Sequence, residues 1–204
     1  MSWVSSGAVQ VGMVGWSLVW WWLTLLPEVS RELQLMHLTA WWPACVALWV
    51  TVTAALMVWV AHARQWRLMG QASALAIPGW YWAALLGPAF SPLPPSADLG
   101  WLAWPLALCC GPWLLRRLQA WLDDSALRHL HVLGFWLMAA LLCRQAQWAT
   151  DQWATPGSGW QSLCWILVPA SLVLLVSSPR AAQRWPLRDF AQSYRVAGAL
   201  PLVA

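Results

Sequence analysis

Long apolar stretches alternate with short polar clusters along the chain. An apolar helix needs about 20 residues to cross the roughly 30 Å hydrocarbon core of a bilayer. Six stretches approach or exceed that length and are predicted to span, at about 7–26, 38–61, 68–88, 99–115, 130–148 and 160–176. A seventh, 196–204, is too short, because nine residues of helix rise only about 14 Å. The pattern predicts an all-α, polytopic transmembrane helical bundle over residues 1–204, with about six spans and an incomplete seventh.

Proline residues bound or interrupt several of these spans. Pro27 is expected to close the first span, because a proline disfavours helix at the residue before it. Pro78 and Gly79 lie in the middle of the third span, where a lost backbone hydrogen bond is expected to kink or divide the helix. Pro105 and Pro112 interrupt the short fourth span, which is expected to tilt, break or enter the bilayer only in part.

The composition excludes an ordinary water-soluble domain. Of 204 residues, 61% are hydrophobic and 9% charged, whereas soluble domains are about 45–50% apolar and about 25% charged. Many of the 22 tryptophans lie near predicted span ends, where an indole is buried while its N–H meets a polar group. We therefore expect the lipid bilayer to be the main partner, and no nucleic acid.

The arginines predict an orientation, because positive loops are retained in the cytoplasm. Two arginines, Arg31 and Arg144, follow the odd-numbered spans or lie near their outer ends. The even-numbered loops contain nine: Arg64, Arg67, Arg116, Arg117, Arg128, Arg180, Arg184, Arg188 and Arg195. This asymmetry places the N-terminus and the even-numbered loops in the cytoplasm.

No residue set indicates catalysis, a metal or a cofactor. The four histidines, His37, His62, His129 and His131, fall near span ends, so we interpret them as water-facing and not as a haem or metal pair. The five cysteines lie within apolar runs without a paired spacing and are interpreted as small buried residues. Asp123 and Asp124, before Ser125, resemble the start of the helix that contains the fifth span.

Arg144 is the one basic residue within a predicted span. An ionisable group at that depth indicates function by default, although its head also lies close enough to the outer end to reach water or Asp151. If the chain transports a substrate, the predicted path passes Pro78, Gly79, Pro105 and Arg144, because interrupted helices free backbone groups that can line a polar route. Plain packing of tolerated prolines is the competing interpretation.

Several segments resemble a large, uncharacterised bacterial family of predicted membrane proteins with many spans. The resemblance rests on residues 130–137 (LHVLGFWL), on Trp160 and Val168-Pro169-Ala170, on 185–187 (WPL), and on Tyr194 with 198–202 (GALPL). It is strongest over residues 90–204. Members of this family are generally far longer, so the resemblance implies that this chain is a fragment joined to further helices. It also implies the bacterial inner membrane, and it brings no catalytic or binding residues.

The sequence leads to three hypotheses of function. The first is an inner-membrane protein with a structural or envelope-associated role and no enzymatic activity. The second is a transporter or channel that uses the interrupted third and fourth spans and Arg144. The third is a membrane enzyme acting on lipid-linked substrates, for which the inner face offers only Asp123, Asp124, His129 and His131.

Overall fold

The structure, a computed structural model, describes residues 6–155, 159–183 and 185–199. Within these residues the regular elements are all helical, which confirms the all-α prediction. The elements in chain order are α1 (Ser6–Leu35), η1 (Thr39–Trp41), α2 (Trp42–Arg64), α3 (Arg67–Ser73), α4 (Ala76–Phe90), α5 (Gly100–Leu118), α6 (Asp124–Asp151), α7 (Trp160–Ser177), α8 (Pro179–Ala182), α9 (Leu187–Gln192) and η2 (Ser193–Ala199).

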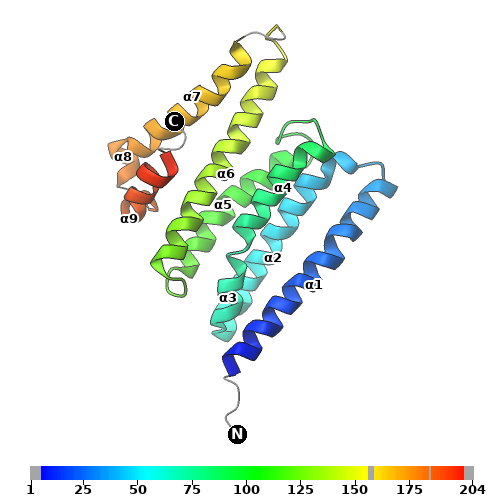
Figure 1. The fold of residues 1–204 in the computed structure, drawn as a ribbon, viewed down its shortest axis with the longest axis vertical. Helices are drawn as coiled ribbons and strands as arrows, with labels where there is room; N and C mark the ends of the chain where they lie inside the picture. The colour runs from blue at the N-terminus through cyan, green and yellow to red at the C-terminus, as the bar shows by residue number, and fades with distance from the viewer. Residues whose placement is uncertain (1–5, 156–158, 184, 200–204) are drawn as a thin grey trace.

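The long helices and α4 run alternately up and down (Figure 1). The connections after α1, α4 and α6 lie at the end drawn uppermost, here called the upper end. Those after α2 and α5 lie at the opposite, lower end. At the lower end, Arg67 Nη2 and Gln71 Nε2 donate to the carbonyl oxygen of Trp121 at 3.2 and 2.7 Å. These bonds hold α3 to the connection between α5 and α6, about 50 residues further along the chain.

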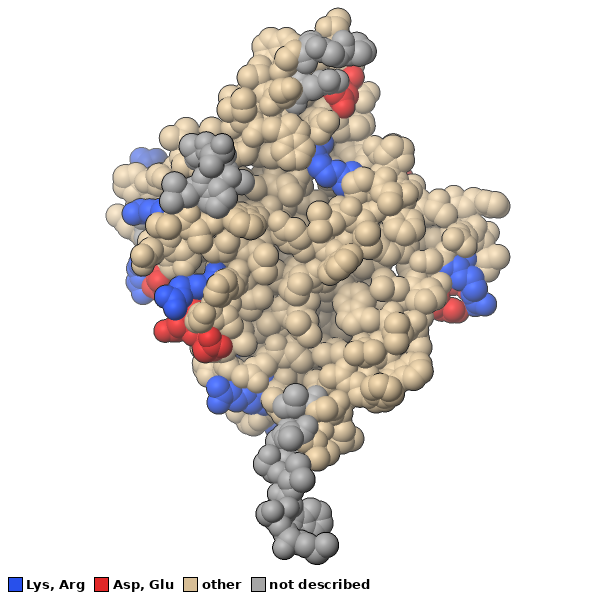
Figure 2. All heavy atoms as spheres, viewed as in Figure 1, with Lys and Arg blue, Asp and Glu red and all other residues tan. Residues whose placement is uncertain are grey.

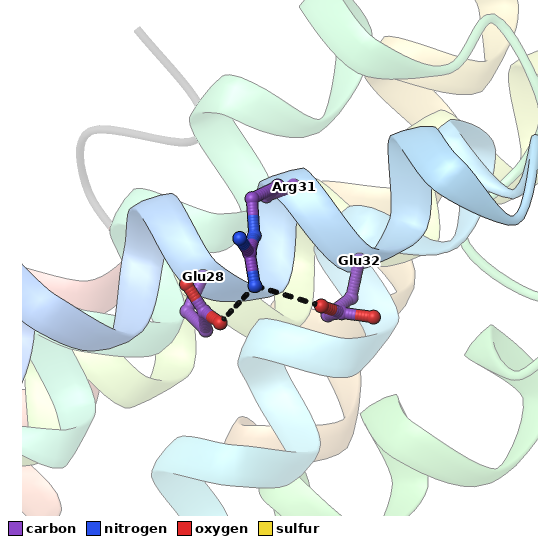
Figure 3. Close-up of polar contacts among 3 residues, drawn as sticks. All are labelled: Glu28, Arg31 and Glu32. Atoms are coloured by element: carbon purple, nitrogen blue, oxygen red, sulfur yellow. Dashed lines mark hydrogen bonds and ion pairs between the residues drawn. The ribbon is translucent and has the colours of Figure 1, made fainter.

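The first helix, α1, continues through Pro27 and the polar residues after it, so the prediction that Pro27 closes the first span is wrong. Its 30 residues form a helix about 45 Å long. Beyond the proline, Arg31 Nη2 lies 2.7 Å from Glu28 Oε1 and 3.2 Å from Glu32 Oε1 (Figure 3). The pair of Glu28 and Arg31, three residues apart, favours continuation of the helix.

The third predicted span is divided into α3 and α4, as the prediction allowed, but the division lies upstream of Pro78 and Gly79. Pro78 occupies the first turn of α4, where a missing N–H leaves no intrahelical bond unmade. A residue with an N–H at position 78 would donate to the carbonyl oxygen of Ala74. That oxygen accepts instead from Ile77 N at 3.2 Å. The chain therefore breaks one turn before the proline.

The fourth predicted span is one continuous helix, α5, of 19 residues, so the expectation of a break is wrong. Pro105 and Pro112 both lie on its exposed side, two turns apart. On the opposite side Ala103, Ala107 and Leu114 are fully buried. The hydrogen bonds removed by the prolines lie on one face, while packing of the other face stabilises the helix.

Helix α6 begins where Asp123 and Asp124 predicted a helix start. The carboxylate of Asp123 accepts a hydrogen bond from Ala126 N at 3.0 Å. This bond stabilises the charged carboxylate and lowers the pKa of Asp123. The resulting helix has 28 residues and extends beyond the predicted 130–148 at both ends.

The last long helix, α7, agrees with the predicted span 160–176 to within a residue. Short helices then return the chain to α6, where Trp136 Nε1 donates to the carbonyl oxygen of Gly198 at 3.0 Å. The predicted incomplete span 196–204 lies only partly within the described residues. Residues 196–199 belong to η2, which packs on α6 and α7, and 200–204 are outside them.

The main hydrophobic core lies where α2 packs on α4 and α5, with α6 closing one side. Alanines with no exposed surface, such as Ala47 and Ala107, allow the helix backbones to approach closely. A smaller cluster joins α6 to α7 and contains Phe135, Ala139, Leu172 and Val176.

Two helical segments of the described chain are long and apolar enough to cross a membrane by length and composition: Thr39–Arg64 and Asp124–Asp151. A shorter apolar helix covers Ser162–Ser177. The count of six spans is not confirmed by this criterion. It stays a prediction.

Candidate functional site

Two titratable side chains of α6, His131 and Arg144, lie seven residues from its first and last residues respectively. Each is therefore about 10 Å from a helix end, and about 20 Å of helix separates the two. Both face the interior of the bundle, where each lines a cavity between α4, α5 and α6. The candidate site is this interhelical seam.

His131, at the lower end of the seam, is 2% exposed. The prediction that it faces water is wrong, because the C-terminal segment folds over it. Its Nδ1 lies 2.8 Å from the hydroxyl oxygen of Tyr194, and its Nε2 is buried without a hydrogen-bond partner. The ring centroids of Phe190 and Trp185 lie 4.3 and 5.7 Å from the centroid of the imidazole. His131 is thus enclosed in an aromatic cluster with one nitrogen left unsatisfied.

A cavity of about 110 Å³ adjoins His131 between α4, α5, α6 and η2. Small residues, Ala107, Gly111 and Gly134, leave room for it. Three of the residues that line it carry a polar side-chain group: His131, Tyr194 and Trp80. The indole N–H of Trp80 already donates to Thr51 Oγ1 at 3.1 Å, so the polar groups of the cavity are those of His131 and Tyr194. The cavity is therefore apolar with one polar end.

Arg144, at the upper end of the seam, is partly buried. Its Nη1 donates to the carbonyl oxygen of Ala84 at 3.4 Å. It lines a cavity of about 30 Å³ together with Ser91 and Asp98 from the proline-rich loop after α4. That loop is fixed to α6, because Ser96 N donates to Gln145 Oε1 at 3.1 Å. The guanidinium thus bonds to the backbone of α4 at a polar, hollowed end of the bundle.

The two cavities follow one another along the same three helices. On α5, Gly100 and Trp104 line the upper cavity, while Ala107 and Gly111 line the lower. The same succession holds on α4 and α6. The two cavities are separate, and Trp80, which lines the lower one, is a large side chain that is 2% exposed.

The other predicted path residues lie elsewhere. Pro78 and Gly79 line a groove of about 380 Å³ that faces Trp22 and Leu26 of α1. Pro105 is exposed on α5. Of the four, only Arg144 lies in the seam, and the path itself stays a prediction.

The inner-face set of Asp123, Asp124, His129 and His131 does not converge. His129 is exposed and its Nδ1 lies 2.7 Å from the carbonyl oxygen of Ser125, while Asp123 caps α6 and His131 is buried. Among the described residues, no three His, Cys, Asp or Glu side chains gather closely enough to hold a metal ion.

Tyr194 is the site residue that sequence reasoning missed. Phe190 and Tyr194 are four residues apart, a spacing that indicates one face of a helix. That signal could have identified an aromatic face in the polar C-terminal segment. It could not have identified His131, 63 residues earlier, as its partner.

Comparison with known proteins gives a family. No curated protein and no solved structure matches the chain. The family model described as "Predicted membrane protein (DUF2339)" matches residues 2–204. This match confirms the family resemblance and extends it from residues 90–204 to nearly the whole chain. The chain therefore belongs to the DUF2339 family of predicted membrane proteins.

Proposed function

We propose that this chain is an integral protein of the bacterial inner membrane, crossing it with α1, α2, the α3–α4 pair, α5, α6 and α7. We further propose a structural or envelope-associated role without enzymatic activity. The family description supports membrane association. The observation that carries the proposal is the apolar outer surface of the helices.

Large hydrophobic side chains are exposed on nearly every long helix. Trp16, Trp59, Trp82, Trp101 and Leu174, from α1, α2, α4, α5 and α7, are each at least 64% exposed. Figure 2 shows the charged side chains gathered toward the margins of the molecule, with a broad uncharged surface between them. A soluble monomer rarely exposes apolar patches of this extent, whereas lipid is a suitable solvent for them.

The distribution of arginines supports an orientation. Arg64, Arg67, Arg116, Arg117 and Arg128 lie on or beside the helix ends at the lower end of the bundle. Toward the upper ends of their helices lie Arg31 of α1 and Arg144 of α6, and Arg31 is paired with two glutamates, while Arg180 and Arg188 belong to α8 and α9 beside the bundle. The excess of positive charge favours a cytoplasmic location for the lower end.

Cysteine labelling tests this topology. In a variant without the five native cysteines, Ser96→Cys places a thiol in the exposed loop of the upper end, and Gln65→Cys places one in the exposed lower connection. We expect a membrane-impermeant maleimide to label Ser96→Cys in intact spheroplasts and Gln65→Cys only after permeabilisation. Equal labelling of both, or recovery of the protein in the soluble fraction, would contradict the proposal.

A transporter or channel is the second candidate, and the succession of two cavities along the α4–α5–α6 seam favours it. In this function Arg144 lies at the outer entrance and His131 at the inner one. Movement of large buried side chains, such as Trp80, would connect the two cavities. Transport sites typically lie beside discontinuous helices, and the break between α3 and α4 lies next to Ile77, which lines the lower cavity.

Accessibility within the seam tests the second candidate. Gly111→Cys lines the lower cavity, and the added Cβ would lie 3.5 Å from Trp80, an ordinary contact. Ala103→Cys, on the same helix but with no exposed surface, is the matched control. Transport predicts that a small charged thiol reagent modifies Gly111→Cys and spares Ala103→Cys. Protection of both residues would exclude a water-filled path at this point.

A further inference from the structure

We propose that the cavity beside His131 binds one small, uncharged molecule that presents an oxygen acceptor to His131 Nε2 and a compact apolar body to the remaining walls. The proposal concerns a ligand site inside the fold. It does not depend on whether the helices cross a membrane or on what the protein transports.

The pair of His131 and Tyr194 forms the polar end of the proposed ligand site. A phenol hydroxyl is a stronger donor than a neutral imidazole N–H, and an imidazole nitrogen is a stronger acceptor than a phenol oxygen. We therefore assign the Tyr194 hydroxyl as the donor to His131 Nδ1, which lies 2.8 Å away, and this assignment places the ring proton on Nε2. That N–H is buried without an acceptor among the described residues, and so is the indole N–H of Trp185, whose ring centroid lies 5.7 Å from that of the imidazole. Burying an unpaired donor is destabilising, and a ligand oxygen would satisfy it.

The remaining walls of the cavity form the apolar part of the proposed ligand site. No charged side chain lines the cavity, so a charged ligand would be desolvated without a counter-ion. The walls are alanine, glycine, leucine, phenylalanine and other apolar groups. These surroundings select an uncharged molecule with most of its surface apolar.

The volume restricts the size of the ligand. The cavity measures about 110 Å³, and an engineered apolar cavity of about 150 Å³ in another protein accommodates benzene. A ring of five or six atoms with one oxygen is therefore near the upper limit. Extended cofactors such as haem or flavin are far too large.

The probe chosen for the test is cyclopentanone, with methylenecyclopentane as the matched compound that has the same shape and no oxygen. The full chain is purified in detergent with ¹⁵N-labelled histidine, and the His131 signal is assigned by its loss in His131→Gln. We expect cyclopentanone to shift the His131 Nε2 resonance saturably. His129, which is exposed, is the internal reference and should not respond.

A cavity-filling variant makes the result specific. A Cβ at Gly134 would meet no atom within 4 Å, so Gly134→Leu can fill the cavity while leaving His131 and Tyr194 in place. We expect cyclopentanone to bind this variant at least about tenfold more weakly. A His131 resonance at its wild-type position, separate from that of the exposed His129, shows that the variant is folded. The proposal is overturned by the absence of a saturable shift, by an equal shift in Gly134→Leu, or by an equal response to methylenecyclopentane.

Discussion

Helices α1 and α2 are both long and apolar, yet α2 contributes many residues to the main core and α1 contributes one buried residue, Leu33, among those whose exposure the structure describes. Along α2, Ala44, Ala47, Ala54, Val58 and Ala61 recur three, four or seven residues apart, and each is at most 5% exposed. The difference shows that small residues repeated on one face, rather than apolar character, decide which helix is packed.

Two grooves beside α1 also show that this helix is packed less closely than α2. A groove of about 390 Å³ is lined by Met13 and Trp21 of α1 and by Met57 of α2, and one of about 380 Å³ is lined by Trp22 of α1 and by Trp82 of α4. Gly12 and Gly15, the small residues that α1 does have, face open space. In lipid an apolar helix gains no hydrophobic free energy from burial against another helix, so close packing requires complementary surfaces.

The largest expected effect comes from tryptophans on one helix that differ only in packing. Trp80 of α4 is 2% exposed and donates to Thr51 of α2, whereas Trp82 is 64% exposed. We expect Trp80→Ala to lower the free energy of unfolding by about 3–5 kcal/mol and Trp82→Ala to change it by less than about 0.5 kcal/mol. Unfolding in detergent, followed by circular dichroism, measures both. Similar losses in the two variants would mean that the exposed surface of α4 is covered by protein. That result would contradict the difference in packing between Trp80 and Trp82.

Glycines in packed and unpacked positions test the same difference in packing, with a smaller expected change in stability. A Cβ at Gly100, the first residue of α5, would lie 1.9 Å from the carbonyl oxygen of Pro95, a backbone atom that cannot turn aside. We expect Gly100→Ala to cost about 1–3 kcal/mol through this clash.

The matched control for Gly100→Ala is Gly12→Ala in α1, where the new methyl group meets no atom within 4 Å. We expect it to stabilise the protein by about 0.5–1 kcal/mol, because alanine favours helix. The melting temperatures of the two variants should therefore move in opposite directions. A loss in Gly12→Ala would indicate that this face of α1 is packed against something.

The sequence predicted α2 and α7 to within a few residues because the stretches 38–61 and 160–176 are apolar and contain no Asp, Glu, Lys or Arg. It failed where proline was taken as a terminator. Pro27 is accommodated within α1, and Pro105 and Pro112 lie on the exposed side of a helix whose other side is packed. A proline removes a local hydrogen bond, whereas tertiary packing decides whether the helix continues, and a single sequence does not reveal that packing.

The candidate site was predictable only in part. Arg144 could be identified, because one charge in an apolar stretch is visible in the sequence. His131 was misplaced because its burial depends on the return of the C-terminal segment, which brings Tyr194 to it from 63 residues away. The spacing of residues along one helix contains no information about that contact.

A smaller effect concerns the polar start of α6, a core helix. The pKa of Asp123 is lowered by its hydrogen bond to Ala126 N. The folded protein therefore binds this proton less readily than the unfolded chain does. The stabilisation by the charged cap is complete above the ordinary aspartate pKa of 3.8 and is lost as the pH falls through the lower, folded value. We expect Asp123→Asn, which keeps a capping oxygen but has no charge, to melt slightly below the wild type at pH 7.

The same variant should approach the wild type in acid, because protonation removes the charge from Asp123 itself. The difference between the two melting temperatures, measured from pH 7 down to about pH 3, isolates this carboxyl from the others. A difference that does not change with pH would show that the charge of the cap contributes nothing. The start of α6 would then be held by packing alone.

The smallest expected effect lies at the polar end of α1. Arg31 pairs with Glu28 and Glu32, but its side chain is 63% exposed and those of the glutamates are 60% and 48% exposed. Exposed pairs of this kind contribute little, so we expect Arg31→Gln to lower the free energy of unfolding by less than about 0.5 kcal/mol, and by still less at high salt. Arg188→Gln, at the exposed pair with Asp189, is the matched control and should behave alike. If Arg31→Gln alone caused a loss above about 1 kcal/mol, the end of α1 would have to be anchored to the bundle more tightly than its burial indicates, and the contrast between α1 and α2 would be limited to the remainder of the helix.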